Sequence, residues 1–310
     1  MQPIDQVREM LKSLVGGPDT PFMERRAQSE KFAAAFPMPH DMRISQGALA
    51  NVPVEWIRPD DAHPDRVFFH VHGGGYVLGN PASSRPFTTE FARRARCRVV
   101  SIDYRLAPEH PFPAAVTDCL VAYSALLASG TRPQDIAIGG ESAGGGLAVA
   151  TLIAARTARL AMPASLIAIS PWTDLACDAP SYRTLAHVDP LLNARTLKEM
   201  AEAYIQAGDP HAPTASPAHA DLNGLPPMLI HVGSEEVLLD DATALERRAR
   251  ASGTSATLEI WPGMIHVWHM FHPMLPQAGE AIAKLAEFVE RRWDQPARAA
   301  KDHTWNGAER

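Results

Sequence analysis

Residues 138–146 read Ile138-Gly139-Gly140-Glu141-Ser142-Ala143-Gly144-Gly145-Gly146. A strand-like apolar run, 136–138, leads into this stretch, and a helix-like run, 147–160, follows it. A serine on a sharp turn from strand to helix needs glycine two positions away on each side, because a side chain there would clash with the bent backbone. Gly140 and Gly144 meet this need. The stretch therefore predicts a nucleophile elbow that presents Ser142 as the attacking residue.

The helix after Ser142 adds electrostatic stabilisation to the predicted elbow. Its first amides point toward the serine, so the N–H of Ala143 can donate to an oxyanion. The helix dipole also favours negative charge that develops at this end. One short stretch is thus expected to supply both the nucleophile and part of the oxyanion hole.

A second glycine-rich stretch lies upstream, where the apolar run 67–71 ends at His72-Gly73-Gly74-Gly75. Consecutive glycines leave their backbone N–H groups unshielded, and each preorganised donor to a tetrahedral intermediate is worth roughly 3 kcal/mol of barrier. We expect Gly74 and Gly75 to be the donors and His72 to brace the loop. A phosphate-binding loop is disfavoured because neither GK[ST] nor GxGxxG spacing follows.

The general base is expected after the serine in the chain, at the end of a strand. Among thirteen histidines, His266 follows the strand-like run 256–261, so its side chain can reach over the sheet edge. His269 and His272 fall at the start of a predicted helix, and His231 lies inside the strand-like run 227–232. We therefore predict that His266 is the base.

The acid that orients this base is sought in the carboxylate-rich turn after residue 232. Four residues compete there, namely Glu235, Glu236, Asp240 and Asp241. Acids in the first turn of a helix are ordinary capping and dipole partners, and Asp240 and Asp241 fit that role. The residues alone leave Glu235 and Glu236 as alternatives.

Together these motifs resemble the hormone-sensitive-lipase-like branch of the α/β-hydrolase esterases, over about residues 66–292. The resemblance rests on HGGG at 72–75, DYRLAPEHPFPAA at 103–115 and GESAGG at 140–145. It implies the α/β-hydrolase fold, with a mostly parallel sheet of eight strands, helices on both faces and a small helical cap. The register of the family's acid motif selects Glu236. The chain departs from the family where Glu236-Val237 replaces the usual Asp-Pro, so Glu235 stays an alternative, and where Glu141 replaces a commoner aspartate or threonine.

The same resemblance implies a serine carboxylesterase that acts on short- to medium-chain acyl esters through an acyl-enzyme. Ser142 would attack, His266 would carry the proton and Glu236 would hold the imidazolium, with no cofactor or metal. One alternative is an amide or carbamate hydrolase with the same residues. Another is a non-catalytic small-molecule receptor on the same fold, which we would expect to have lost the nucleophile or the base.

Composition agrees with one globular enzyme domain. The chain has 310 residues, of which 46% are hydrophobic, a size that α/β folds take as a single domain. Its 29 basic and 35 acidic residues give a net charge of −6, which predicts neither a nucleic-acid nor a membrane partner. No apolar run reaches about eighteen residues, and the N-terminus lacks the unbroken apolar core of a signal peptide. The three cysteines are scattered along the chain, so we predict neither a disulfide frame nor a zinc site built on them. They indicate a reducing, cytoplasmic compartment.

Strand-like and helical runs alternate from about Met42 onward, which indicates a mostly parallel sheet covered on both faces. Two segments, at about residues 1–40 and 177–217, break the alternation. The resemblance implies that they form the cap over the active site. The first has helical period and ends at Pro37-Met38-Pro39, and the second contains a predicted helix over 194–207. We expect a mobile tail over 294–310, and a homodimer through the short strand 256–261 if it lies at a sheet edge.

Overall fold

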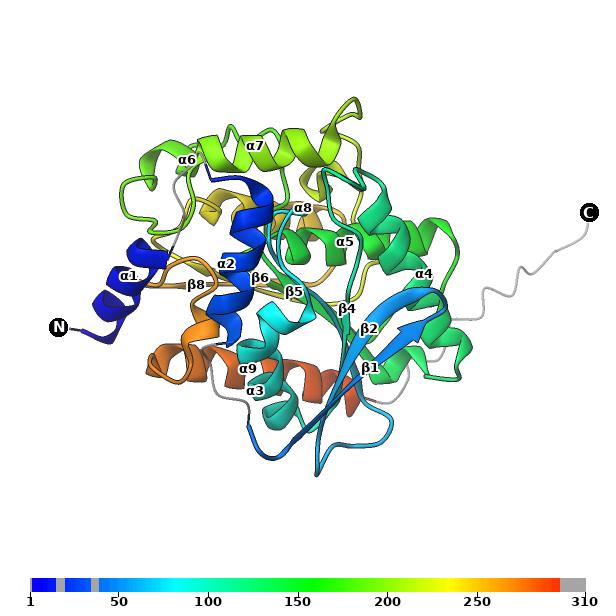
Figure 1. Ribbon diagram of the computed structural model, residues 1–310. Coiled ribbons are helices and arrows are strands. Elements are labelled where there is room, and N and C mark those ends of the chain that lie inside the picture. Colours follow the sequence, from blue (N-terminus) through cyan, green and yellow to red (C-terminus); the bar gives the residue numbers. More distant parts are fainter. Residues whose placement is uncertain (1, 15–19, 35–38, 296–310) are drawn as a thin grey trace, which may run out of the picture.

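The sheet is the frame of the protein, whose computed structural model describes residues 2–14, 20–34 and 39–295. Its eight strands lie in the order β1-β2-β4-β3-β5-β6-β7-β8. β2 pairs antiparallel with β1 and β4, and every other pairing is parallel, as predicted (Figure 1). The strands are β1 (Met42–Leu49), β2 (Val52–Pro59), β3 (Val67–Val71), β4 (Arg98–Ile102), β5 (Ile136–Glu141), β6 (Ser165–Ile169), β7 (Met228–Gly233) and β8 (Ala256–Trp261).

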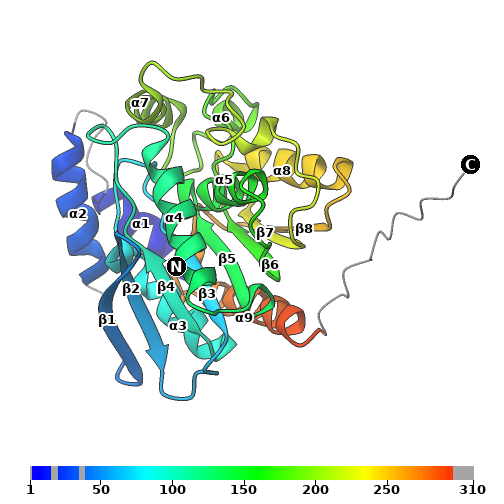
Figure 2. The same ribbon diagram turned by 90° about the vertical axis from the view of Figure 1, so that its right-hand side faces the viewer.

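Helices cover both faces of this sheet. Figure 2 shows α4 (Ala114–Ala128), α5 (Ala143–Thr157) and α8 (Leu239–Ala251) on one face, with α3 (Arg85–Ala95) and α9 (Pro276–Trp293) on the other. Two separate clusters of buried apolar side chains fill the two spaces between helices and sheet. Central strands such as β3 and β5 are buried at every position, which explains why apolar residues predominate in them.

The two segments that break the strand–helix alternation carry the remaining helices. The first contains α1 (Pro3–Leu14) and α2 (Phe22–Ala34), and the second contains α6 (Ser181–Thr184) and α7 (Ala194–Ile205), with α6 and α7 at the top of Figure 1. Residues 35–38, which include part of the predicted breaker, and residues 296–310 of the predicted tail lie outside the described residues. Short 3-10 turns are η1 (Pro81–Ser84), η2 (Pro133–Asp135), η3 (Pro217–His219) and η4 (Trp268–Phe271).

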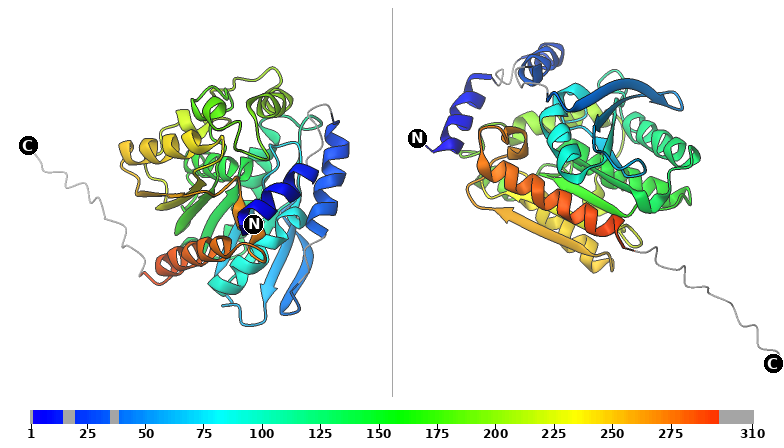
Figure 3. Two further views of the ribbon diagram at one scale, coloured as in Figure 1. Left: turned by 90° about the vertical axis from the view of Figure 1, so that its left-hand side faces the viewer. Right: turned by 90° about the horizontal axis from the view of Figure 1, so that it is seen from below.

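The strand β8 lies at one edge of the sheet and β1 at the other, as the view from below in Figure 3 shows. The outer row of backbone groups on β8 therefore lacks a neighbouring strand within the described chain. Ile260 on this strand is one of the few large apolar residues with an exposed side chain, at 48%. Among the described helices, none combines the length and apolar character that crossing a membrane requires.

Candidate active site

Ser142 occupies the turn between β5 and α5 with a backbone conformation that non-glycine residues rarely adopt. Its φ and ψ are 57° and −126°. The turn is pressed against the end of β3, since a Cβ atom added at Gly140 or at Gly144 would lie 2.1 Å from the carbonyl oxygen of Val71. Only glycine fits at these two positions, and the bent backbone holds the Ser142 hydroxyl at the carboxyl end of the central strands.

Three side chains from three different strand ends meet at this point. Nε2 of His266 lies 3.0 Å from Oγ of Ser142, and Nδ1 of His266 lies 2.8 Å from Oε2 of Glu236. Ser142 is 9% exposed, His266 5% and Glu236 not at all, so the contacts are shielded from water while the serine remains reachable. The arrangement has the geometry in which a histidine takes a proton from a hydroxyl while a carboxylate fixes its tautomer.

The structure places Glu236, and not Glu235, against the imidazole. Glu235 points the other way and forms an ion pair with Arg8 of α1. The second oxygen of Glu236 accepts hydrogen bonds from the backbone N–H of Gly233 at 2.5 Å and from Oγ of Ser170 at 2.9 Å. These two donors fix the carboxylate in the orientation that reaches His266.

Ser170 is a residue that sequence reasoning missed. Its Oγ also accepts a hydrogen bond from the backbone N–H of Val267 at 3.1 Å. One hydroxyl thus links the loop that carries Glu236 to the loop that carries His266. The available signal was its position, since Ser170 directly follows β6, the strand between those that end at Ser142 and near Glu236.

The glycine loop after β3 bends sharply and lies against α7. Gly74 and Gly75 have φ values of 113° and 61°, which favour glycine. A Cβ atom would lie 2.2 Å from the carbonyl oxygen of Leu78 at the first position and 2.2 Å from Sδ of Met200 at the second. Both glycines line the same cavity as Ser142. Ala143, the third predicted donor, is the first residue of α5.

Glu141, whose role the sequence left open, holds this glycine loop. Its carboxylate accepts hydrogen bonds from the N–H of Gly73 at 2.9 Å and from Oγ of Ser84 at 2.5 Å, and lies 2.8 Å from Nε2 of His70. Burial alone would raise the pKa of Glu141, but the His70 imidazole and these donors outweigh it and lower that pKa. His70 is in turn fixed by Ser101, 2.7 Å from its Nδ1.

His72 braces the loop, as predicted. Its ring stacks on Tyr104 with centroids 4.1 Å apart, and its Nδ1 lies 2.8 Å from the carbonyl oxygen of Gly73. Burial lowers the pKa of His72 to about 4, so the ring is neutral at neutral pH. It therefore supports the backbone and is not placed to carry a proton for Ser142.

The other histidines considered as bases lie elsewhere. His231 and His269 are fully buried and contact each other, with Nδ1 of the first 3.1 Å from Nε2 of the second. Burial lowers the pKa of His231 to about 3 and that of His269 well below its ordinary value. His272 directly follows the 3-10 turn η4, so the helix predicted here is shorter than expected.

Asp240 and Asp241 lie in the first turn of α8, where acids suit the helix dipole as predicted, but neither side chain caps the helix. Asp240 accepts a hydrogen bond from the N–H of Ser181, at the start of α6. Asp241 accepts from the N–H groups of Thr173 and Asp174, at 2.8 and 3.0 Å. Both carboxylates therefore tie α8 to the chain after β6, because donors from that segment reach them.

A cavity of about 520 Å³ opens onto Ser142 and His266. Both segments predicted as cap contribute to its walls. Its apolar lining comes from Leu11 of α1, from Leu197 and Met200 of α7, and from Leu78, Leu191, Leu192, Met270 and Phe271.

Comparison with known proteins agrees with this architecture. The model of a family described as having the alpha/beta hydrolase fold matches residues 68–270. An acetyl-hydrolase of Streptomyces hygroscopicus is 49% identical over 236 residues, covering 76% of this chain and 78% of that protein. An esterase of Acinetobacter venetianus is 36% identical over 264 residues, covering 84% and 86%. The crystal structure of an esterase from the bacterial hormone-sensitive lipase family superimposes with a TM-score of 0.92 at 43% identity, covering 94% of this chain and 98% of the other.

The chain belongs to the alpha/beta hydrolase fold family. Within it, the chain is a carboxylic-ester hydrolase of the hormone-sensitive-lipase branch.

Proposed function

We propose that Ser142, His266 and Glu236 hydrolyse acyl esters through an acyl-enzyme. Ser142 Oγ attacks the acyl carbonyl carbon while Nε2 of His266 takes its proton, and the tetrahedral intermediate collapses as His266 protonates the departing alcohol. Water then attacks the acyl-serine, gives a proton to His266 and releases the acid, and the proton returns to Ser142. The observation that carries this proposal is the continuous contact from Ser142 through His266 to Glu236 at the wall of the cavity.

The amides of Gly74, Gly75 and Ala143 form the oxyanion hole of this proposal. Two observations support it: Gly74 and Gly75 line the same cavity as Ser142, and Ala143 begins α5 directly after Ser142. Glu141 contributes indirectly, because it holds the N–H of Gly73 and so fixes the loop.

The substrates proposed are esters with short to medium acyl chains. The cavity volume of about 520 Å³ falls within the range of small-molecule sites, roughly 300–1,000 Å³, and its lining is largely apolar. α1, α2 and α7 close over it as the cap, which excludes water and limits the length of the chain that fits.

An amide or carbamate hydrolase would use the same residues. The two activities differ in the leaving group, because an amine must be protonated before it departs, whereas an alkoxide is a better leaving group. A matched pair of substrates, an aryl ester and the corresponding anilide, separates them. We expect turnover of the ester to exceed that of the anilide by at least about a hundredfold.

Labelling with a fluorophosphonate tests the assignment of the nucleophile. The probe should form one covalent adduct per chain with the wild type, and none with Ser142→Ala, as read by intact mass. Ser29→Ala is the matched control, because Ser29 also lines the cavity but belongs to α2. Ester hydrolysis should fall at least about a thousandfold in Ser142→Ala with the thermal melt unchanged. A folded Ser142→Ala protein that is still labelled, or still turns over, contradicts the proposal.

We further propose a symmetric homodimer that pairs through β8 and a reducing, cytoplasmic location. The dimer is supported by the edge position of β8 and the exposed side chain of Ile260. The location is supported by Cys97, Cys119 and Cys177, all of which are buried and free of disulfides.

A further inference from the structure

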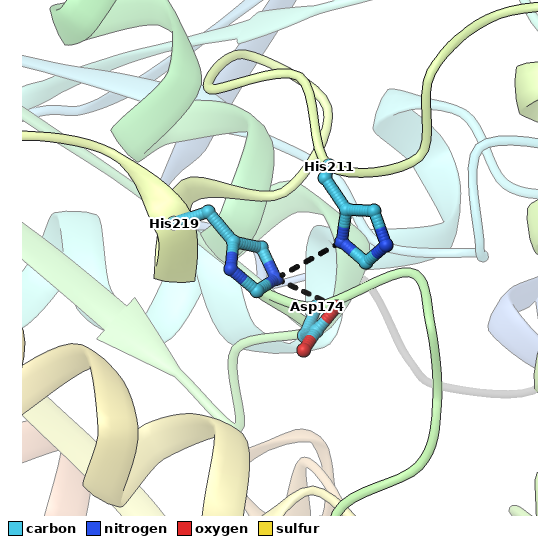
Figure 4. A group of neighbouring side chains, drawn as sticks. All are labelled: Asp174, His211 and His219. Carbon is cyan, nitrogen blue, oxygen red and sulfur yellow. Dashed lines mark hydrogen bonds and ion pairs between the residues drawn. The ribbon is translucent and has the colours of Figure 1, made fainter.

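Two histidines and an aspartate from three different segments point toward one another (Figure 4). Asp174 lies in the loop after β6, His211 in the loop after α7, and His219 in η3. None of the three lines the active-site cavity. They therefore form a separate cluster, for which ester hydrolysis has no use.

The spacing of the ligand atoms matches that of a small divalent cation site. Nε2 of His219 lies 3.4 Å from Nδ1 of His211 and 3.2 Å from Oδ1 of Asp174. One possible ligand atom from each of the three residues lies within 4.8 Å of the other two. In a tetrahedral zinc site, bonds of about 2.0–2.2 Å place neighbouring ligand atoms roughly 3.3–3.5 Å apart. The His211–His219 pair, at 3.4 Å, has this separation, and the His219–Asp174 pair, at 3.2 Å, is slightly shorter.

One proton on Nε2 of His219 can serve only one of its two close neighbours. Nε2 of His219 faces both a ring nitrogen and a carboxylate oxygen. When Nε2 of His219 is protonated, its N–H can donate to only one of the two partners. When Nε2 is unprotonated, its lone pair faces the lone pairs of the Asp174 carboxylate. A cation placed between the three atoms accepts a lone pair from each of them at once.

Hydrogen bonds with the backbone hold two of the three residues in place. Oδ1 of Asp174 accepts a hydrogen bond from the N–H of Ala176 at 3.0 Å, and the backbone N–H of His211 donates to Asp209 at 2.9 Å. Such bonds orient the groups that bind a metal. The side chains of His219 and Asp174 are 41% and 22% exposed, which leaves a path for an ion from solvent.

We propose that Asp174, His211 and His219 bind one Zn²⁺-like divalent ion, with water completing its coordination. Asp174 precedes the cap segment 177–217, and His211 and His219 lie at its other end, so the ion joins the two ends of the cap. Two imidazoles and a carboxylate suit zinc and similar borderline metals better than Ca²⁺ or Mg²⁺. Sequence reasoning missed this site, because the two histidines are eight residues apart and Asp174 lies in a different segment.

Calorimetric titration of ZnCl₂ into chelator-treated, dialysed protein tests the site. We expect one equivalent to bind to the wild type, with an affinity at least about tenfold weaker in His211→Ala, in His219→Gln and in Asp174→Asn. His187→Ala is the matched control, since His187 is an exposed histidine of the cap outside the cluster, and it should bind as the wild type does. Zinc should also raise the melting temperature of the wild type by about 2–4 °C and leave that of His211→Ala unchanged.

Thermal melts without zinc show which variants are folded. If Asp174→Asn is unfolded, either His219→Gln or His211→Ala is sufficient to test the site. Absence of stoichiometric binding to the wild type overturns the proposal. So does zinc that is lost in His266→Ala but retained in His211→Ala, because that ion then occupies the active site. Equal binding by the wild type and the double variant His211→Ala/His219→Gln overturns it as well.

Discussion

Oε2 of Glu236 lies 2.8 Å from Nδ1 of His266, while the adjacent Glu235 forms an ion pair with Arg8 on α1. The two glutamates follow β7 in a turn and have different partners, so only one of them reaches the imidazole. The other one joins the N-terminal helix to the loop that carries the acid.

This relationship predicts opposite outcomes for the two glutamates. Glu236→Gln should lower kcat for an aryl ester at least about a hundredfold, because a neutral amide no longer stabilises the imidazolium or fixes its tautomer. Glu235→Gln and Asp240→Asn should stay within about threefold of the wild type. Steady-state kinetics with a thermal melt on each variant checks this. A folded Glu235→Gln protein with a similarly large loss of kcat would show that Glu235, and not Glu236, is the acid.

Ser170 should act as a positioning residue for the acid and the base. Ser170→Ala removes the hydrogen bond to Glu236 and the acceptor for Val267, and we expect kcat to fall about tenfold to a hundredfold with little change in KM. Ser165→Ala is a matched control, since Ser165 is a buried serine at the start of β6, the strand that Ser170 follows, and its hydroxyl has no hydrogen-bond partner among the described residues. An equal fall in both variants would indicate a general packing effect.

Glu141 should support both stability and turnover. Glu141→Gln removes a buried charge that His70 and two hydrogen-bond donors stabilise, so we expect a loss of about 3 kcal/mol in the free energy of unfolding at pH 7. The pKa of Glu141 is lowered, so its contribution is present above the ordinary value of 4.5 and is lost as the pH falls through the lower folded value. Denaturant unfolding of both proteins from pH 7 downward should show their difference shrinking. A difference that does not change with pH would contradict this account.

Asp241 should give the opposite pH dependence. Burial raises its pKa from 3.8 to about 7, so the folded state binds a proton more tightly than the unfolded state does. Stability from this group is full below pH 3.8 and is lost as the pH rises to about 7, with a slope of up to about 1.4 kcal/mol per pH unit. Asp241→Asn should flatten the unfolding free energy across this window, whereas Asp240→Asn, at the half-buried neighbouring position, should not. Equal slopes for the wild type and Asp241→Asn would refute the assignment.

The proposed dimer depends on β8. Light scattering should give a dimer for the wild type at micromolar concentration, and a monomer for Ile260→Lys, because a buried cation at a strand-pairing interface is unfavourable. Met274→Lys is the control, since Met274 is 41% exposed but lies outside β8. A wild type that is monomeric under these conditions contradicts the proposal.

The sequence by itself determined the features that depend on short-range geometry. The glycines around Ser142 and the apolar runs before and after it specify a strand, a tight turn and a helix, and the structure has all three at β5, Ser142 and α5. The runs 67–71 and 256–261 likewise became β3 and β8 with the expected bounds. Such features are readable because the residues that fix the backbone are neighbours in the chain.

Only the tertiary structure decided which side chains share a contact. Ser170 bonding to Glu236, Glu141 holding the loop at Gly73, and Asp241 bonding to Thr173 join residues 66 to 68 positions apart. Their expected place in the first turn of a helix assigned Asp240 and Asp241 to capping and dipole roles, because the sequence shows only neighbours along the chain. Their actual partners, and the meeting of Asp174 with His211 and His219, follow from how the sheet and the cap bring distant loops together.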